Sequence, residues 1–323
     1  MSENTNTTKR RSAIQIMGSL IGLVKPLLHI MLAAIILGTL GYLCAIFLTI
    51  LAGQVIMHGL LTGVAGMIVP VDNMWRVFTP VKTIITVMIV IAVLRGILHY
   101  VEQYCNHFIA FKLLAIIRHK VFAALRKLCP AKLEGRDKGN LISIITTDIE
   151  LLEAFYAHTI SPIAIATLTS IIMVIFIGRY HWLAGVIALV AYLIVGVVIP
   201  MWNGKRGSQK GMEFRTNFGE LNSFVLDSLH GLDETIQYGQ GEKRKEQMSE
   251  HSKNLAGMQE SLSKMEGSQR SFTNMVILLA SFGMLALTIW LYDKGAMGFE
   301  GILTCTIAMM GSFGPVRSEE RRV

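Results

Sequence analysis

The chain has 323 residues, of which 52% are hydrophobic and only 16% charged, and its mean hydropathy is +0.52. This composition excludes an ordinary soluble domain of the same length, in which long uncharged apolar runs are rare. The formal net charge of +8 is distributed along the chain by segment rather than gathered in one patch, so we interpret it as a topological signal and expect no nucleic-acid partner.

Hydrophobic runs divide the chain into membrane-crossing and polar segments. A helix needs roughly 20 apolar residues to cross about 30 Å of hydrocarbon, and a backbone in lipid must satisfy its own hydrogen bonds. Five runs meet this length and predict helical spans: 27–51, 83–101, 159–178, 181–201 and 272–292. A sixth run, 301–316, falls short of a full crossing, so we expect an incomplete last span. Residues 317–323 form a charged tail.

The placement of Lys and Arg predicts the orientation of these spans. Four basic residues lie in segment 1–26, eight in 102–158 and ten in 202–271, whereas the other connections hold few. Positive residues concentrate on the cytoplasmic side of membrane proteins. The sequence therefore predicts a multi-pass protein of a bacterial inner membrane, with the N terminus and both long loops in the cytoplasm.

The first long loop is predicted to be helical beyond the bilayer. Apolar residues recur at three- and four-residue steps through 104–128, with no Pro or Gly before Pro130. This helix would extend span two by roughly 37 Å. A glycine-containing turn, a short apolar piece at 141–145 and a capping box opened by Thr147 follow, after which a helix returns to span three.

The second long loop repeats this organisation. Span four is predicted to continue through 205–229 with an apolar stripe, and a polar helix returns from Glu242 toward span five. Between them, Gly231 and Gly239 bracket a short piece, 232–238. The sequence therefore predicts two long helical hairpins in the cytoplasm, each ending in a short transverse tip.

These tips carry a family resemblance. Segment 125–148 resembles the first intracellular loop of ATP-binding-cassette (ABC) exporters, and segment 231–239 resembles their second loop. The likeness extends from span one to Pro315. Within the family, the run 95–111 most resembles bacterial half-transporters grouped with amino-acid or thiol exporters. It implies an all-α, six-helix transmembrane domain over 27–316. It also implies coupling elements that dock on nucleotide-binding domains, formed by Gly139, Asn140, Leu141, Asp148, Gly231, Glu234, Tyr238 and Gly239.

The resemblance also implies partners: a nucleotide-binding domain holding ATP and Mg²⁺, a second half-transporter in a homo- or heterodimer, and membrane lipid. Two departures stand out. Ser143-Ile144 replaces the Ser-Arg of many relatives, and the sequence contains no phosphate loop of the pattern G-x-x-x-x-G-K-[ST]. We therefore expect no ATP hydrolysis by this chain alone. A chain truncated before the ATPase domain and a separate membrane subunit are both compatible with this ending.

One polar face interrupts span two. Arg95 is followed by His99, Glu102 and Asn106 at helical spacing, which stacks the four on one face. A charge in lipid costs at least about 2.5 kcal/mol, so this face must meet water, protein or substrate. One hypothesis is that Arg95, His99 and Glu102 line a translocation pathway for an anionic or zwitterionic solute. The alternative is that Arg95 pairs with Glu102 or extends toward the headgroups.

Other side chains predict no further chemistry. The four cysteines and nine histidines show no metal-ligand spacing. Pro162 and Pro200, near the ends of spans three and four, suit either a hinge or a passive kink. The membrane part of an ATP-driven transporter is the function that the sequence favours. The alternatives are a secondary transporter or channel subunit, which would not explain the two hairpins, and a non-functional truncated remnant.

Overall fold

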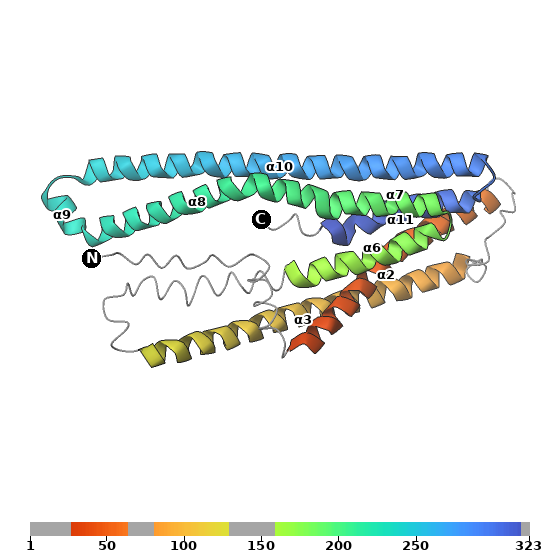
Figure 1. The fold of residues 1–323 in the computed structure, drawn as a ribbon, viewed down its shortest axis with the longest axis horizontal. Coiled ribbons are helices and arrows are strands. Elements are labelled where there is room, and N and C mark those ends of the chain that lie inside the picture. The colour runs from red at the N-terminus through yellow and green to blue at the C-terminus, as the bar shows by residue number, and fades with distance from the viewer. Residues whose placement is uncertain (1–26, 64–80, 129–158, 318–323) are drawn as a thin grey trace, which may run out of the picture. The chain divides into compact units, whose positions relative to one another are not determined.

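The computed structural model describes residues 27–63, 81–128 and 159–317, and every element in these ranges is helical (Figure 1). The described residues divide between two compact units, one within 1–175 plus 314–323 and the other at 176–313. Six helices are long and apolar enough to cross a membrane. The predicted all-α, six-span architecture is confirmed.

The first unit is built around helices α2 (Leu28–Gly63) and α3 (Val81–Leu128), which pack against each other, and includes most of α6 (Ser161–Gly178). Helix α3 runs 48 residues without a break, about 72 Å, so the predicted extension of span two is confirmed. A core cluster of Leu27, Ile109 and Leu113 joins the beginning of α2 to the distal part of α3.

The second unit begins with a tight hairpin between the end of α6 and α7 (Trp182–Leu193). The Tyr180 N–H donates to the Ile177 carbonyl at 3.1 Å, and His181 caps α7 by accepting the Leu183 N–H on Nδ1 at 3.2 Å. Gly178 keeps the two helices close, since a Cβ there would lie 3.7 Å from the Gly185 Cα. This short turn agrees with the gap of two residues between the predicted spans 159–178 and 181–201.

Helix α7 passes through a π-turn, η5 (Ile194–Val198), into α8 (Ile199–His230). The Ile199 N–H donates to the Ile194 carbonyl, one residue wider than in an α-helix. Pro200 follows at once and has no N–H to donate, which is one of the established causes of such local rearrangement. The sequence identified Pro200 as a kink or hinge, and the structure shows the π-turn beside it.

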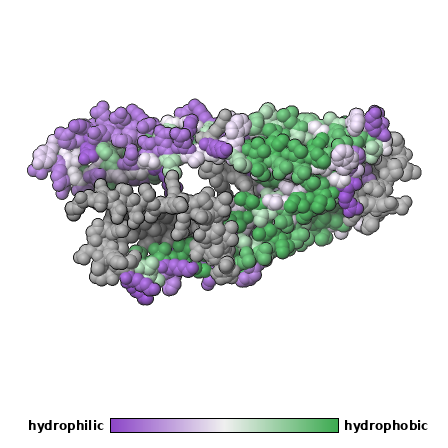
Figure 2. Space-filling view, viewed as in Figure 1, coloured by the Kyte–Doolittle hydropathy of each residue, from purple (hydrophilic) through white to green (hydrophobic). Residues whose placement is uncertain are grey.

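Helix α8, the short helix α9 (Leu232–Gln237) and helix α10 (Gly241–Asp293) form the second predicted hairpin. Half-buried side chains on α10 recur at heptad-like steps and face α8 as in an antiparallel coiled coil: Met248, Leu255, Met258, Leu262 and Met265. Figure 2 shows the polar distal part of this hairpin and the apolar surface where α10 accompanies α7.

Helix α11 (Phe299–Arg317) completes the described chain. It begins two residues before the predicted run and ends one residue after it, so its 19 residues span about 28 Å. By length and composition it therefore counts as a sixth span, where we had expected an incomplete one. Within the second unit, Ser312 of α11 shares a buried hydrogen bond with the Tyr192 hydroxyl of α7, and Phe313 meets the Tyr192 ring edge-on.

Candidate functional site

The second predicted tip is a complete local structure. Helix α9 ends in a Schellman motif, in which the Gln240 N–H donates to the Thr235 carbonyl at 2.9 Å and the Gly239 N–H to the Ile236 carbonyl at 3.1 Å. Gly239 occupies the left-handed position of this motif with φ +64°. A residue with a side chain is costly there, which explains why glycine ends the tip.

The other end of the tip is held by side-chain and backbone bonds to Gly231. Its carbonyl accepts the Thr235 N–H at 2.9 Å and the Thr235 hydroxyl at 2.7 Å, and its N–H donates to the Asp227 carbonyl at 2.9 Å. The carbonyl of Glu234 accepts the Tyr238 N–H at 2.9 Å. The structure thus brings the predicted residues Gly231, Glu234, Tyr238 and Gly239 into one short, internally bonded element.

The tip presents apolar side chains to solvent. Leu232, Ile236 and Tyr238 are 48%, 69% and 72% exposed, and no residue of α9 is buried. Asp233 and Glu234 lie in its first turn. Apolar side chains gathered on a surface outside the membrane are typical of a docking surface. The first predicted tip, with Gly139, Asn140, Leu141 and Asp148, lies outside the described residues.

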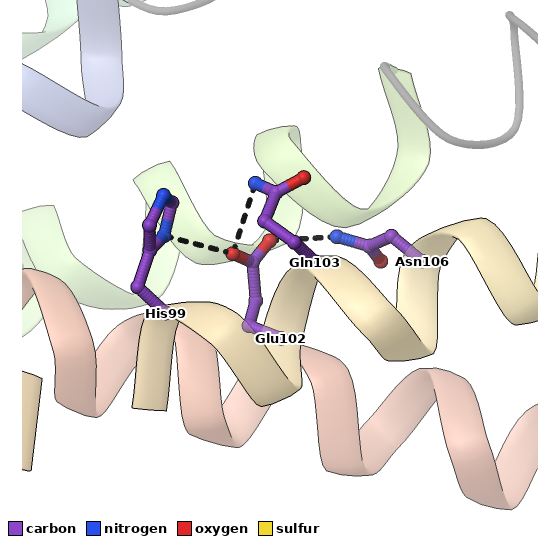
Figure 3. A network of polar contacts seen from close by, with 4 residues as sticks. All are labelled: His99, Glu102, Gln103 and Asn106. Atoms are coloured by element: carbon purple, nitrogen blue, oxygen red, sulfur yellow. Dashed lines mark hydrogen bonds and ion pairs between the residues drawn. The ribbon is translucent and has the colours of Figure 1, made fainter. Parts of the chain in front are cut away.

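The polar face of α3 is centred on Glu102, as Figure 3 shows. The Glu102 carboxylate accepts three side-chain donors from its own helix. Asn106 Nδ2 donates to Oε1 at 2.6 Å, Gln103 Nε2 donates to Oε2 at 3.1 Å, and His99 Nδ1 lies 3.2 Å from Oε2. The Glu102 side chain is 5% exposed, whereas the His99 side chain is 61% exposed.

Glycine lets neighbouring helices cover this carboxylate. A Cβ at Gly38 of α2 would lie 3.0 Å from Glu102 Cγ and would overlap Ile165 of α6. A Cβ at Gly41, one turn further along α2, would lie 3.9 Å from the His99 backbone nitrogen. The close approach of α2 therefore buries Glu102 and leaves the imidazole of His99 on the open side.

The predicted face is thus divided by burial. Glu102 and Asn106 are buried, and Arg95 and His99 are exposed. Among the described residues, no ion pair joins Arg95 to Glu102. This conformation therefore does not contain the pairing that the sequence analysis offered as an alternative. Arg95 instead lies within electrostatic range of the Cys44 thiol on α2.

Two participants were missed by the sequence analysis. Gln103 is adjacent to Glu102 and does not share its helical face by spacing, yet its long side chain reaches back to the carboxylate. Gly38 lies on another helix, and no sequence signal connects it to residue 102. Within the described ranges, no group of three or more His, Cys, Asp or Glu side chains is arranged to hold a metal ion.

Comparison with known proteins places this architecture in a family. The family model described as "ABC transporter transmembrane region" matches residues 27–316. The chain therefore belongs to the ABC transporter transmembrane family and is the membrane part of an ABC transporter, a multi-pass membrane protein. The match does not favour a secondary transporter or a channel.

Individual relatives agree with this assignment. A probable ABC transporter ATP-binding/permease protein of Haemophilus influenzae is 38% identical over 95% of this chain and 53% of its own length. An ATP-dependent lipid A-core flippase of Pasteurella multocida is 23% identical over 71% of this chain and 40% of its own. The glutathione/L-cysteine transport system ATP-binding/permease protein CydD of Bacillus subtilis is 22% identical over 52% of this chain and 28% of its own length. The chain spans about half the length of the first relative.

Proposed function

We propose that this chain forms the translocation pathway of an ATP-driven exporter and couples to nucleotide-binding domains through its two cytoplasmic tips. Helix α9, with Leu232, Ile236 and Tyr238 exposed, is the observation that carries the proposal. The tip sits at the end of a long two-helix arm, so a force applied there is transmitted along α8 and α10 rather than lost in a loop. We assign the corresponding first tip, by the sequence resemblance, to residues 139–148, which lie outside the described residues.

The proposal includes partners and location. ATP binds to the nucleotide-binding domain, in line with the ATP-binding part named in the Haemophilus relative, together with Mg²⁺, and a second half-transporter completes the pathway. Coupling requires that each domain stabilise one of two membrane packings differentially. The distribution of Lys and Arg supports an inner-membrane location with the N terminus and both tips in the cytoplasm.

The pathway itself includes the open side of the α3 face. Arg95 and His99 are exposed on a membrane-spanning helix, and a charge exposed to lipid is costly. We place these two side chains on the aqueous pathway. Glu102 is covered by α2, so it does not face the pathway and acts only through its contact with His99.

A tip variant tests the coupling proposal. Ile236→Asp places a charge in the middle of the apolar docking surface, so ATP hydrolysis and co-purification of the nucleotide-binding subunit should fall about ten-fold or more. Met212→Asp is the matched control, because Met212 is equally exposed at 65% on α8 but lies well before the tip. Equal losses in both variants, or no loss in either, would contradict docking at the tip.

A further inference from the structure

Exposed aromatic side chains mark two levels along the helices of the second unit. The continuous helical path from Trp182 at the start of α7 to Trp202 on α8 is about 30 Å long, at about 1.5 Å per residue. On α10, the path from Phe272 to Trp290 is about 27 Å long. Both lengths match the hydrocarbon thickness of a bilayer, and Trp is enriched at both membrane–water interfaces.

The two paths meet at one of these levels. The Trp202 ring lies edge-on to the Phe272 ring, with 6.1 Å between the ring centroids. We call Trp202 and Phe272 the aromatic boundary. Because α8 and α10 are the two arms of one hairpin, this contact also places Trp182 and Trp290 at a common end. Figure 2 shows the surface of this hairpin changing from hydrophobic to hydrophilic along α8 and α10, as expected for helices that leave a membrane.

Two lysines follow directly beyond the aromatic boundary on α8. Lys205 lies about 5 Å and Lys210 about 12 Å beyond Trp202 along the helix, and both are exposed. A lysine stem is long enough to bring either ammonium group into the headgroup layer. Among the described residues, no ion pair includes Lys205 or Lys210, and Lys210 Nζ donates only to the neutral Ser261 Oγ, at 3.3 Å.

The basic side chains of α10 at the same height are already neutralised. Lys264 Nζ lies 2.6 Å from Glu260 Oε1, and Arg270 Nη2 lies 2.9 Å from Glu266 Oε1. Each of these cations thus has an acid one turn earlier on its own helix. The two lysines of α8 therefore carry the positive charge that remains without a counter-charge beside the aromatic boundary.

We infer that α8, just beyond the aromatic boundary, binds the headgroups of anionic phospholipids. Lys205 and Lys210 contact the negatively charged headgroup, and Trp202 lies where the headgroup meets the acyl chains. Each basic side chain close to an anionic membrane surface favours binding about five-fold. In the proposed topology this is the cytoplasmic leaflet, which carries the negative surface potential. The inference requires only that α8 and α10 leave the membrane here, and it does not depend on coupling through the tip.

Fluorescence quenching of Trp202 in the full chain tests the inference. Trp202 is kept as the only tryptophan, with Phe at the three other positions, and the chain is reconstituted in mixed bilayers. Either phosphatidylglycerol or phosphatidylcholine carries brominated acyl chains, which quench an indole that they touch, so the two experiments differ only in the headgroup. Phosphatidylglycerol should be preferred about five-fold or more, and less so at high salt, which screens exposed charges. Equal quenching by the two lipids would overturn the inference.

Charge variants test whether the preference comes from α8. Lys205→Gln combined with Lys210→Gln should lower the preference to about one. Lys243→Gln combined with Lys245→Gln is the matched control, because it removes two charges from α10 about 40 Å from Phe272 along the helix and should leave the preference unchanged. A preference that survives the α8 double variant, or that falls equally in both, contradicts binding by these two lysines.

Bound lipid can also be counted on the chain with all its tryptophans. From an equimolar mixture, the chain should retain phosphatidylglycerol in several-fold excess over phosphatidylcholine in native mass spectrometry, and the α8 double variant should lose this excess. Equal retention by the unaltered chain would count against the lipid site. Neither measurement needs a nucleotide-binding domain, so failure of the tip experiment leaves both unaffected. Conversely, a chain that couples through Ile236 and shows no lipid preference would retain the proposed function and lose the lipid site.

Discussion

At the scale of single residues, the candidate site depends on the absence of a side chain at one position. Helical spacing alone places Arg95, His99, Glu102 and Asn106 on one face of α3. The structure divides this face, because Gly38 lets α2 approach until Glu102 is covered. Buried Glu102 then satisfies three donors, and the exposed imidazole is oriented as a consequence.

Gly38→Ala should disturb this arrangement. The added methyl would overlap Ile165 and press on Glu102 Cγ at 3.0 Å, and overpacking of this kind costs about 1–3 kcal/mol. We expect a lower unfolding temperature in detergent and a changed ¹⁵N signal of His99. Gly96→Ala on α3 is the control, because nothing lies within 4 Å of its Cβ position. An unfolding temperature and a His99 signal unchanged in Gly38→Ala would show that the side chains around Glu102 move aside at little cost.

At the scale of elements, the α8–α10 hairpin must be stiff to carry force from its tip. Its arms meet through half-buried Met and Leu side chains of α10 and through one aromatic contact near the tip. The Phe224 ring of α8 lies 5.0 Å from the Arg244 guanidinium carbon and 5.4 Å from the His251 ring centroid, both on α10. This contact joins the two arms within a few turns of α9.

Phe224→Ala should loosen the tip. Loss of the ring removes apolar contact and a cation–π interaction worth about 0.5–1 kcal/mol at an exposed site. Amide hydrogen exchange in 232–237 and 244–251 should therefore become several-fold faster, because opening of the local hairpin becomes easier. Phe218→Ala is the control, since Phe218 stacks on Phe214 of its own helix and is 47% exposed. Identical exchange in both variants would exclude Phe224 as the contact that joins the arms.

At the scale of the whole molecule, six helices of spanning length and the family match over 27–316 identify the membrane part of an ABC transporter. The described structure contains the second hairpin, and the segment predicted to form the first lies within the family match over 27–316 but partly outside the described residues. The direction in which the hairpins extend follows from the proposed topology. That topology places the turns at 179–181 and 294–298 on the outer side.

Cysteine accessibility checks this orientation. In a background without native cysteines, Tyr238→Cys should react with an impermeant maleimide only in inside-out vesicles, because the positive-inside distribution places the tip in the cytoplasm. Lys294→Cys, in the turn after α10, should react only in intact cells. The two positions serve as each other's control. Labelling of Tyr238→Cys from outside would invert the topology and remove the basis for coupling through this tip.

The sequence by itself determined the properties that depend on local pattern. Uncharged runs defined the spans, the unbroken apolar periodicity of 104–128 predicted the continuation of α3, and Gly231 and Gly239 marked the ends of α9. Each of these follows from a helix's own length, period or turn geometry, which neighbouring residues specify.

Only the tertiary structure decided which side of the α3 face is covered. Spacing shows that Arg95, His99 and Glu102 share a face, but it does not show that Gly38, more than sixty residues earlier in the chain, brings α2 against Glu102. It also did not predict the π-turn before Pro200 or the contact of Phe224 with Arg244. Burial depends on helices distant in sequence, and periodicity within one helix carries no information about what packs on it.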